Sequence, residues 1–229
     1  MQNTSSRSTQ TSLFVLWVLV NIVGWSASHT ILRLPSLQIA DEILPLIAAF
    51  VLDGMLVGVI VGAGQWLILK RTFPQLSGWI QITALTYSVG LLVSLPAEIL
   101  WLYQMGTSQG LPMLAEEATT TMLPSPPLML VATGAIVGVA QWRKLRSHLA
   151  PTFRNAALWV VGTMAGLGVG WFVVGNRFEN IEALQGVSNI LSGVIMGLVN
   201  GSITGGVLLI LLNETKRIAA TEVKGLTGV

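Results

Sequence analysis

The sequence predicts an all-α integral membrane protein with six transmembrane helices, arranged as three parallel helical-hairpin repeats with both termini in the cytoplasm. Three observations lead to this prediction. The mean hydropathy is +0.72 and only 10% of the residues are charged, whereas soluble domains carry roughly 25% charged residues. Six apolar stretches are long enough to cross a bilayer. Lys and Arg are concentrated in alternate connections between these stretches.

The predicted spans, each near the roughly 20 residues that cross a bilayer, lie at 12–33, 45–69, 79–101, 123–142, 156–175 and 189–212. The first resembles either a cleavable signal sequence or a retained span. Its apolar stretch continues to Leu34, which favours retention. The six spans form one transmembrane domain, residues 12–213. A disordered cytoplasmic segment, 1–11, precedes it, and a cytoplasmic tail, 214–229, follows it.

Proline and basic residues mark the ends of the other spans. Lys70 and Arg71 end the second span, and Arg143 follows the fourth. Pro96 is expected to break or kink the third span, which would place 97–105 along the membrane interface. Pro151 separates the fourth and fifth spans, and basic residues follow the sixth.

Orientation follows from the distribution of the 12 Lys and Arg residues. All except Arg33 and Arg177 lie before span 1, in the connections between spans 2 and 3 and spans 4 and 5, or after span 6. Because Lys and Arg are enriched on the cytoplasmic side, both termini are expected to be cytoplasmic.

A sequence motif that recurs in the even-numbered spans predicts the three helical-hairpin repeats. Gly58-x-x-x-Gly62-x-x-Gln65-Trp66 recurs as Gly134-x-x-x-Gly138-x-x-Gln141-Trp142, and a degraded copy reads Gly193-x-x-x-Gly197-x-x-Asn200-Gly201. The odd-numbered spans contain an early Trp followed by small residues. The expected repeats are about 12–70, 78–146 and 155–213.

Glycines four residues apart let two membrane helices approach closely. The glycines expected in such contacts are Gly58, Gly62, Gly134, Gly138, Gly166, Gly170, Gly193 and Gly197. Tryptophans near basic connections are expected to anchor the helices at the membrane interface. They are Trp66, Trp79, Trp142 and Trp159.

Gln65 and Gln141 share a helix face with the second glycine of their motif and are expected to point into the bundle. In a structural interpretation, each amide bonds a neighbouring backbone carbonyl and locks the hairpin. In a functional one, the amides line a polar path or hold a ligand. The repetition favours the structural interpretation. Asn21 and Asn200, deep in spans 1 and 6, are expected to bond across helices.

At these residues the chain resembles uncharacterised multi-pass membrane proteins of cyanobacteria and related bacteria. Those proteins repeat a Gly-rich helix ending in Gln-Trp, a basic turn and a Trp-led helix, as residues 54–175 do here. The third copy departs from the pattern. The resemblance implies an architecture, and a plasma or thylakoid membrane of a photosynthetic bacterium, but no activity.

An ionisable residue inside a span is a functional hypothesis by default. Asp53, about 12 Å into span 2 at 1.5 Å per residue, would bind a cation, relay protons or pair with an outer basic residue. His29, Arg33, Glu98 and Arg177 form a candidate site towards the outer side.

Composition and motifs exclude several functions. The chain has no Cys and only two His, so no metal site is expected, and the motifs of intramembrane proteases are missing. Basic residues do not form the stripe typical of nucleic-acid binding. We expect no catalytic residues and no obligatory cofactor, although bound lipid or pigment would fit. The expected partners are the bilayer and either a larger membrane complex or further copies of the chain. The favoured function is that of an accessory or scaffold subunit. The alternative is a small-solute or ion channel or secondary transporter that uses Asp53.

Overall fold

The computed structural model describes residues 3–32, 43–108, 127–175 and 185–227. These residues form six helices and contain no strand, which confirms the predicted all-helical class. The helices are α1 (Asn3–Leu32), α2 (Ile43–Thr72), α3 (Trp79–Ser108), α5 (Pro127–Leu145), α6 (Phe153–Gly175) and α7 (Gln185–Thr227). Four of them, α1, α2, α6 and α7, contain stretches that are long and apolar enough to cross a membrane.

Two short connections, 73–78 and 146–152, join α2 to α3 and α5 to α6. Each contains a proline, Pro74 or Pro151, which lacks a backbone N–H and disfavours helical geometry in the preceding residue. Gly78, which precedes α3, has a φ of 69°, a conformation that glycine adopts without strain. These residues therefore separate each pair of helices by a tight turn.

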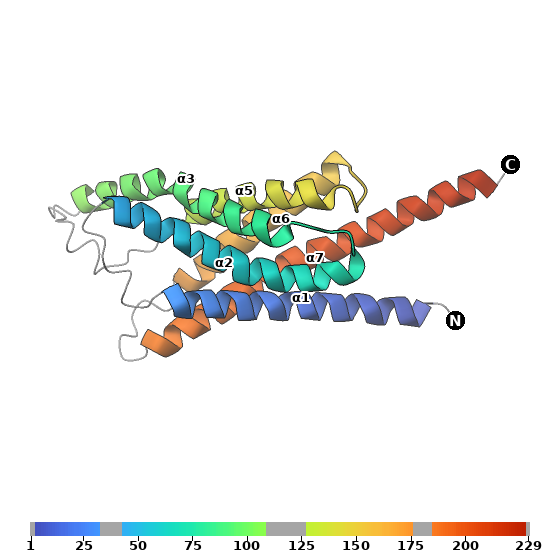
Figure 1. Cartoon of the computed structure of the whole chain (residues 1–229), viewed down its shortest axis with the longest axis horizontal. Coiled ribbons are helices and arrows are strands. Elements are labelled where there is room, and N and C mark those ends of the chain that lie inside the picture. The colour runs from blue at the N-terminus through green and yellow to red at the C-terminus, as the bar shows by residue number, and fades with distance from the viewer. Residues whose placement is uncertain (1–2, 33–42, 109–126, 176–184, 228–229) are drawn as a thin grey trace.

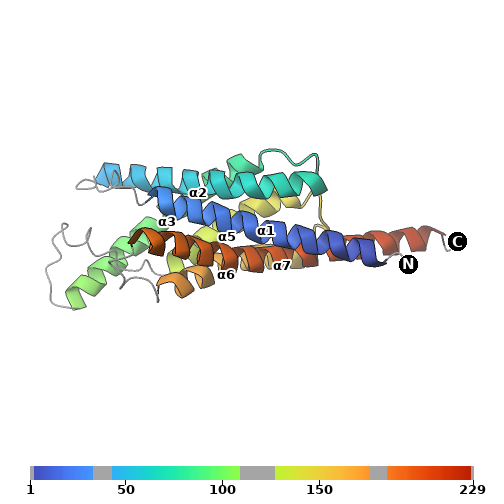
Figure 2. The ribbon, with the colours of Figure 1, turned by 90° about the horizontal axis from the view of Figure 1, so that it is seen from below.

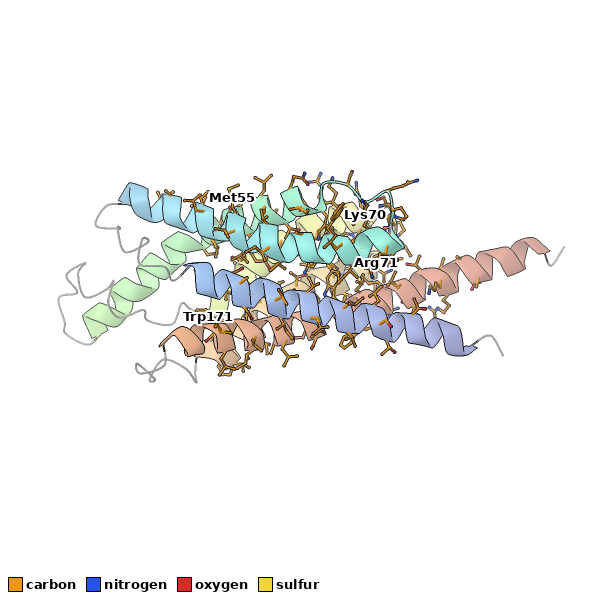
Figure 3. The ribbon with its side chains drawn as sticks, turned by 60° about the horizontal axis from the view of Figure 1, so that its bottom comes forward. Met55, Lys70, Arg71 and Trp171 are labelled. Atoms are coloured by element: carbon orange, nitrogen blue, oxygen red, sulfur yellow. The ribbon has the colours of Figure 1, made fainter. Side chains whose placement is uncertain are left out.

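The helices form a closed ring. Each packs against the next in the order α1, α2, α3, α5, α6, α7, and α7 packs in turn against α1. Figures 1 and 2 show both termini at the same end of the ring as the two short connections. Figure 3 shows Lys70 and Arg71 at this end of α2, and Met55 towards the other end. We call it the basic end, because the described basic side chains lie in a short connection, in the helix turns beside one, or in the projecting part of α7: Lys70, Arg71, Arg143, Lys144, Arg146, Arg154, Lys216 and Arg217.

One glycine contact recurs in three helix pairs: α2 with α3, α5 with α6, and α7 with α1. In each pair, a Cβ added to the glycine would lie within 3.0 Å of the backbone of the neighbouring helix, so no larger residue fits without moving a helix. The equivalent contacts lie between Gly58 and Ala84, between Gly134 and Met164, and between Gly197 and Ile22.

The same pairs share a second contact one helical turn further along. In each pair the second glycine faces the residue that directly follows a buried tryptophan. These contacts are Gly62 on Ile80, Gly138 on Val160, and Gly201 on Val18. The third pair therefore joins the last helix of the chain to the first.

These contacts correct the predicted alignment of the third copy. Gly197 and Gly201, and not Gly193 and Gly197, make the contacts that Gly58 and Gly62 make. Gln65 and Gln141 follow Gly62 and Gly138 by three residues, and Thr204 follows Gly201 by three. Thr204 is therefore the equivalent of the glutamines, and Asn200 lies one helical turn before it. Gly193 still packs closely, against Ser26.

One other expectation differs from the structure. Helix α1 begins at Asn3, where a disordered segment was predicted. Helix α7 continues to Thr227, so the described part of the predicted tail is helical. Both helices extend past the bundle and contact each other, as the hydrogen bond from Gln10 Nε2 to Asn213 Oδ1 shows. Helix α3 runs through Pro96 without a break, although its last turns diverge from the other helices in Figure 2.

Candidate functional site

Asn21 is the centre of a hydrogen-bonded layer in the bundle interior. It is fully buried on α1, and its Nδ2 donates to Trp17 O at 2.8 Å, one turn earlier in the same helix. Its Oδ1 accepts two bonds from other helices. Gln65 Nε2 on α2 and Asn200 Nδ2 on α7 each donate to it at 3.2 Å. One side chain thus joins three helices.

Gln141 extends this layer to two more helices. From α5, its Nε2 donates to Gln65 Oε1 at 3.5 Å and to Thr83 Oγ1 on α3 at 3.2 Å. Both glutamines are buried. The bonds therefore run without interruption from α7 through α1, α2 and α5 to α3.

A second bond ties α1 to α7 beside this layer. Trp17 Nε1 donates to Thr204 Oγ1 at 3.0 Å, and Thr204 Oγ1 donates to Asn200 O at 2.7 Å. Hydrogen bonds between membrane helices contribute about 0.6 kcal/mol each on average, so the five bonds between side chains on different helices amount to about 3 kcal/mol.

Some buried polar atoms near this layer have no partner. Asn200 Oδ1 accepts no hydrogen bond, and it lies against Gly166 on α6. The ring nitrogens of Trp79 and Trp159, which correspond to that of Trp17, donate none. An unsatisfied buried polar group costs about 1–3 kcal/mol, so the layer retains unused capacity for hydrogen bonds.

An apolar cluster closes the layer towards the basic end. Trp17 and Trp159 meet edge to face, with ring centroids 6.3 Å apart and an interplanar angle of 74°. The cluster lies one turn from the polar residues in every helix and belongs to one continuous core. Six of its side chains that are at most 1% exposed are Trp17, Trp79, Trp159, Leu69, Leu145 and Leu208.

A second apolar cluster closes the layer on its other side. Trp25 and Tyr87 meet there at 6.1 Å between ring centroids. Val61, Val137 and Leu167 belong to the same core and are at most 1% exposed. The polar side chains are therefore enclosed between two apolar clusters, where water competes little for their hydrogen bonds.

The chemistry available to this layer is that of neutral amides, hydroxyls and indole N–H groups. These groups can hold helices together or bind a small polar molecule, but they cannot transfer a proton near neutral pH. Across the described part of the chain, no three His, Asp or Glu side chains are grouped so that they could hold a metal ion.

The structure brings together four of the predicted site residues: Gln65, Gln141, Asn200 and Asn21. The glutamine amides bond side chains on other helices, and no bond to a neighbouring backbone carbonyl is found for them, because they point across the ring at equivalent heights. The remaining candidates lie outside the residues whose side chains the structure describes. They are Asp53, His29, Arg33, Glu98 and Arg177.

Trp79 and Trp159 are not interface anchors. They are 0% and 1% exposed, because Trp79, at the start of α3, and Trp159, in the second turn of α6, point to the ring interior. Trp142 is also buried, at 9%. Trp66 is half-buried and lies at the helix end, with Nε1 donating to Leu76 O at 3.3 Å and Lys70 Nζ 4.6 Å from its ring centroid.

Sequence reasoning missed Trp17, Thr83 and Thr204 as members of the layer. A signal for the first two is present: a Trp is followed four residues later by Asn or Thr in each odd-numbered span, at 17 and 21, 79 and 83, and 159 and 163. Residues four apart share a helix face, so this pattern places a polar group one turn beyond each buried ring.

The packing around the ring joins α7 to α1, and the polar layer crosses five helices. Comparison with protein-family models, curated proteins and solved structures finds no match to this chain.

Proposed function

We propose that this protein is a non-enzymatic accessory or scaffold subunit of a bacterial plasma or thylakoid membrane. It crosses the bilayer six times, keeps the basic end and both termini in the cytoplasm, and associates with lipid, pigment or another membrane complex. Two features support this proposal: a closed interior and a helix that projects from it.

The closed interior argues against a permanently open path. Trp17, Trp79 and Trp159 fill the ring near the basic end together with three leucines that are at most 1% exposed. A solute could pass this layer only if these rings moved apart. The amides next to it bond one another, which stabilises a fixed assembly of helices.

The projecting helix is the observation that carries the proposal. Helix α7 has 43 residues, so it is about 65 Å long, whereas a bilayer core is about 30 Å thick. Figures 1 and 2 show its C-terminal part extending beyond the other helices at the basic end. We call the part after Leu212 the α7 arm.

The direction of the α7 arm is fixed by contacts at its base. Glu214 forms an ion pair with Arg154, at the start of α6, with 3.2 Å between Oε2 and Nη1. Thr215 Oγ1 accepts a bond from Ala150 N at 3.1 Å, in the connection before α6. A helix held in this way is preorganised to present one surface to a partner, which lowers the entropic cost of association.

Shortening the α7 arm after its base tests the proposal. A chain that ends at Arg217 keeps Glu214 and Thr215 and should therefore fold as the full chain does. In mildly solubilised native membranes, the full chain should migrate within a larger assembly and the shortened chain alone. The proposal fails if the full chain migrates alone, or if the shortened chain stays in the assembly.

A small-solute or ion channel or secondary transporter is the second candidate, and Asn200 favours it. Its Oδ1 is a buried acceptor without a partner, as expected of a site that awaits a polar solute. In a transporter the Trp layer would be a closed gate, and Asp53 would supply the charge for coupling.

Flux measurements separate the two candidates. Vesicles that contain the full chain should show no uptake of cations or small polar solutes above that of empty vesicles if the accessory role is right. Uptake that Asp53→Asn abolishes, in a variant with unchanged helicity and thermal unfolding, would replace the accessory role by transport.

A further inference from the structure

A groove between α3 and α5 opens on the outer face of the ring near the basic end. Its volume is about 710 Å³, within the range of about 300–1,000 Å³ typical of ligand sites. Ile82 and Thr86 of α3 and Ala140 of α5 line its apolar part. Thr86 Oγ1 donates to Ile82 O at 2.6 Å, so its hydroxyl is used within the helix.

The groove ends in three cations. Arg143, Lys144 and Arg146 line it at the basic end; the two arginines are exposed and the lysine is half-buried. Glu214 is the one acidic residue whose side chain the structure describes, and it pairs with Arg154 and Arg217. No described acid therefore neutralises the three cations of the groove.

The other seams between helix pairs provide an internal comparison. The seam between α1 and α2 and the seam between α6 and α7 are closed by glycines. A Cβ on Gly24 would lie 2.9 Å from Val61, and one on Gly162 would lie 2.8 Å from Val207. The residues equivalent to Gly24 and Gly162 in α3 are Thr86 and Ile82, whose side chains line the groove.

The cations are also specific to this seam. With Gly62, Gly138 and Gly201 taken as equivalent, two of the three cations are replaced by apolar residues in α2, and all three by Gly or apolar residues in α7. The residues at the positions of Arg143, Lys144 and Arg146 are Leu67, Ile68 and Lys70 in α2, and Gly206, Val207 and Leu209 in α7. Helix α2 instead has its basic residues at Lys70 and Arg71, in its own last turn.

The helix ends add to the positive potential. Helix α3 begins at Trp79 at this end of the bundle, and the N-terminus of a helix favours anions. Lys144 Nζ lies close to Gly78, where a Cβ would be 3.1 Å away. The cations and the start of α3 therefore converge at the mouth of the apolar groove.

We propose that this groove binds one anionic phospholipid, with an acyl chain against Ile82, Thr86 and Ala140 and the phosphate at Arg143, Lys144 and Arg146. The inference rests on the membrane location proposed above but not on the accessory role. An apolar surface that leads into a cluster of cations at headgroup depth matches the two parts of such a lipid.

Native mass spectrometry of the purified full chain, with phosphatidylglycerol or phosphatidylcholine of identical acyl chains added, measures the preference. Each cation near an anionic headgroup supports about a fivefold preference, so three give on the order of 100-fold. We expect one bound phosphatidylglycerol and a loss of nearly all of this preference in the triple variant Arg143→Gln, Lys144→Gln, Arg146→Gln. The matched control, Lys70→Gln, Arg71→Gln, Arg154→Gln, removes three cations from the same end and should keep it.

A second variant tests the acyl part. Ala140→Leu fills the groove and leaves all cations in place, so it should release the lipid; Thr86→Leu serves the same purpose if Ala140→Leu does not fold. The proposal is wrong if the control loses as much preference as the triple variant, if a folded groove-filling variant keeps the lipid, or if inorganic phosphate displaces it. These results would leave the membrane location intact, whereas a chain that is soluble without detergent would overturn both.

Discussion

Asn21 and Asn200 share one hydrogen bond but should differ in their importance for stability. Asn21 Oδ1 accepts from two other helices, so Asn21→Ala removes two interhelical bonds, or about 1.2 kcal/mol at the average of about 0.6 kcal/mol for such bonds. It also leaves the amide groups of Gln65 and Asn200 without this acceptor. Asn200→Ala removes only one of these bonds.

Asn200→Ala has a compensating effect as well. It deletes an Oδ1 that is buried without a partner, and such an atom costs about 1–3 kcal/mol. Both substitutions delete the same atoms from sites that are 0% and 3% exposed, so the costs of the cavities are similar. We therefore expect Asn21→Ala to lower the free energy of unfolding more than Asn200→Ala, by about 1–3 kcal/mol.

Reversible unfolding in mixed micelles, followed by circular dichroism, measures this difference. The double variant Asn21→Ala, Asn200→Ala gives the coupling energy of the shared bond, expected near 0.6 kcal/mol. Equal destabilisation by the two single variants, or a greater effect of Asn200→Ala, would show that the unpartnered Oδ1 has been assigned wrongly and that the layer is not organised around Asn21.

Further predictions concern close packing, the buried tryptophans and the ring closure. Gly197→Ala should prevent assembly of the bundle, because its Cβ would overlap the α1 backbone. Gly206→Ala, whose Cβ would have nothing within 4 Å, should be neutral or stabilise the protein by up to about 1 kcal/mol. Similar helix contents and unfolding curves for the two variants would contradict the packing. Trp17→Phe breaks a hydrogen bond and Trp159→Phe breaks none, so the first should be more destabilising by about 0.5–1.5 kcal/mol, as measured by unfolding in micelles. A circular permutant that joins the termini by a flexible linker and opens the chain at 146–152 should keep its helix content, because α7 already packs on α1; loss of helix in detergent would disprove this pairing.

Much of the fold could be predicted because bilayers impose simple rules. Low charge and apolar stretches predicted a helical membrane protein. Lys70, Arg71 and Pro151 identified the connections that the structure places at 73–78 and 146–152. The inward direction of Gln65 and Gln141 followed from their spacing to glycines on the same face.

The alignment of the third copy could not be read from the chain. Gly193, Gly197, Gly201 and Gly205 continue at intervals of four residues, so the sequence contains several equally regular registers. Only the contacts with α1 distinguish them. Asn200 has the same spacing to Gly197 as Gln65 has to Gly62, but Thr204 occupies the position of the glutamine in the bundle.

The site could be predicted only in part, because hydrogen-bond partners depend on which helices become neighbours. Asn21 and Gln65 lie in the first and second spans, and their spacing in the chain does not indicate that they bond. The direction of Trp79 was also ambiguous, since a tryptophan near a basic connection fits either an interface or a core position.

The pairing of α7 with α1 constrains how the protein is made. Gly193, Gly197 and Gly201 are translated after the other five described helices, so the first helix cannot make these contacts until α7 has left the ribosome. During that interval, the Asn21 amide lacks its partner on α7, Asn200. Ring closure therefore follows the synthesis of α7, and nascent chains stalled before α7 should be recognised by chaperones or proteases as incomplete.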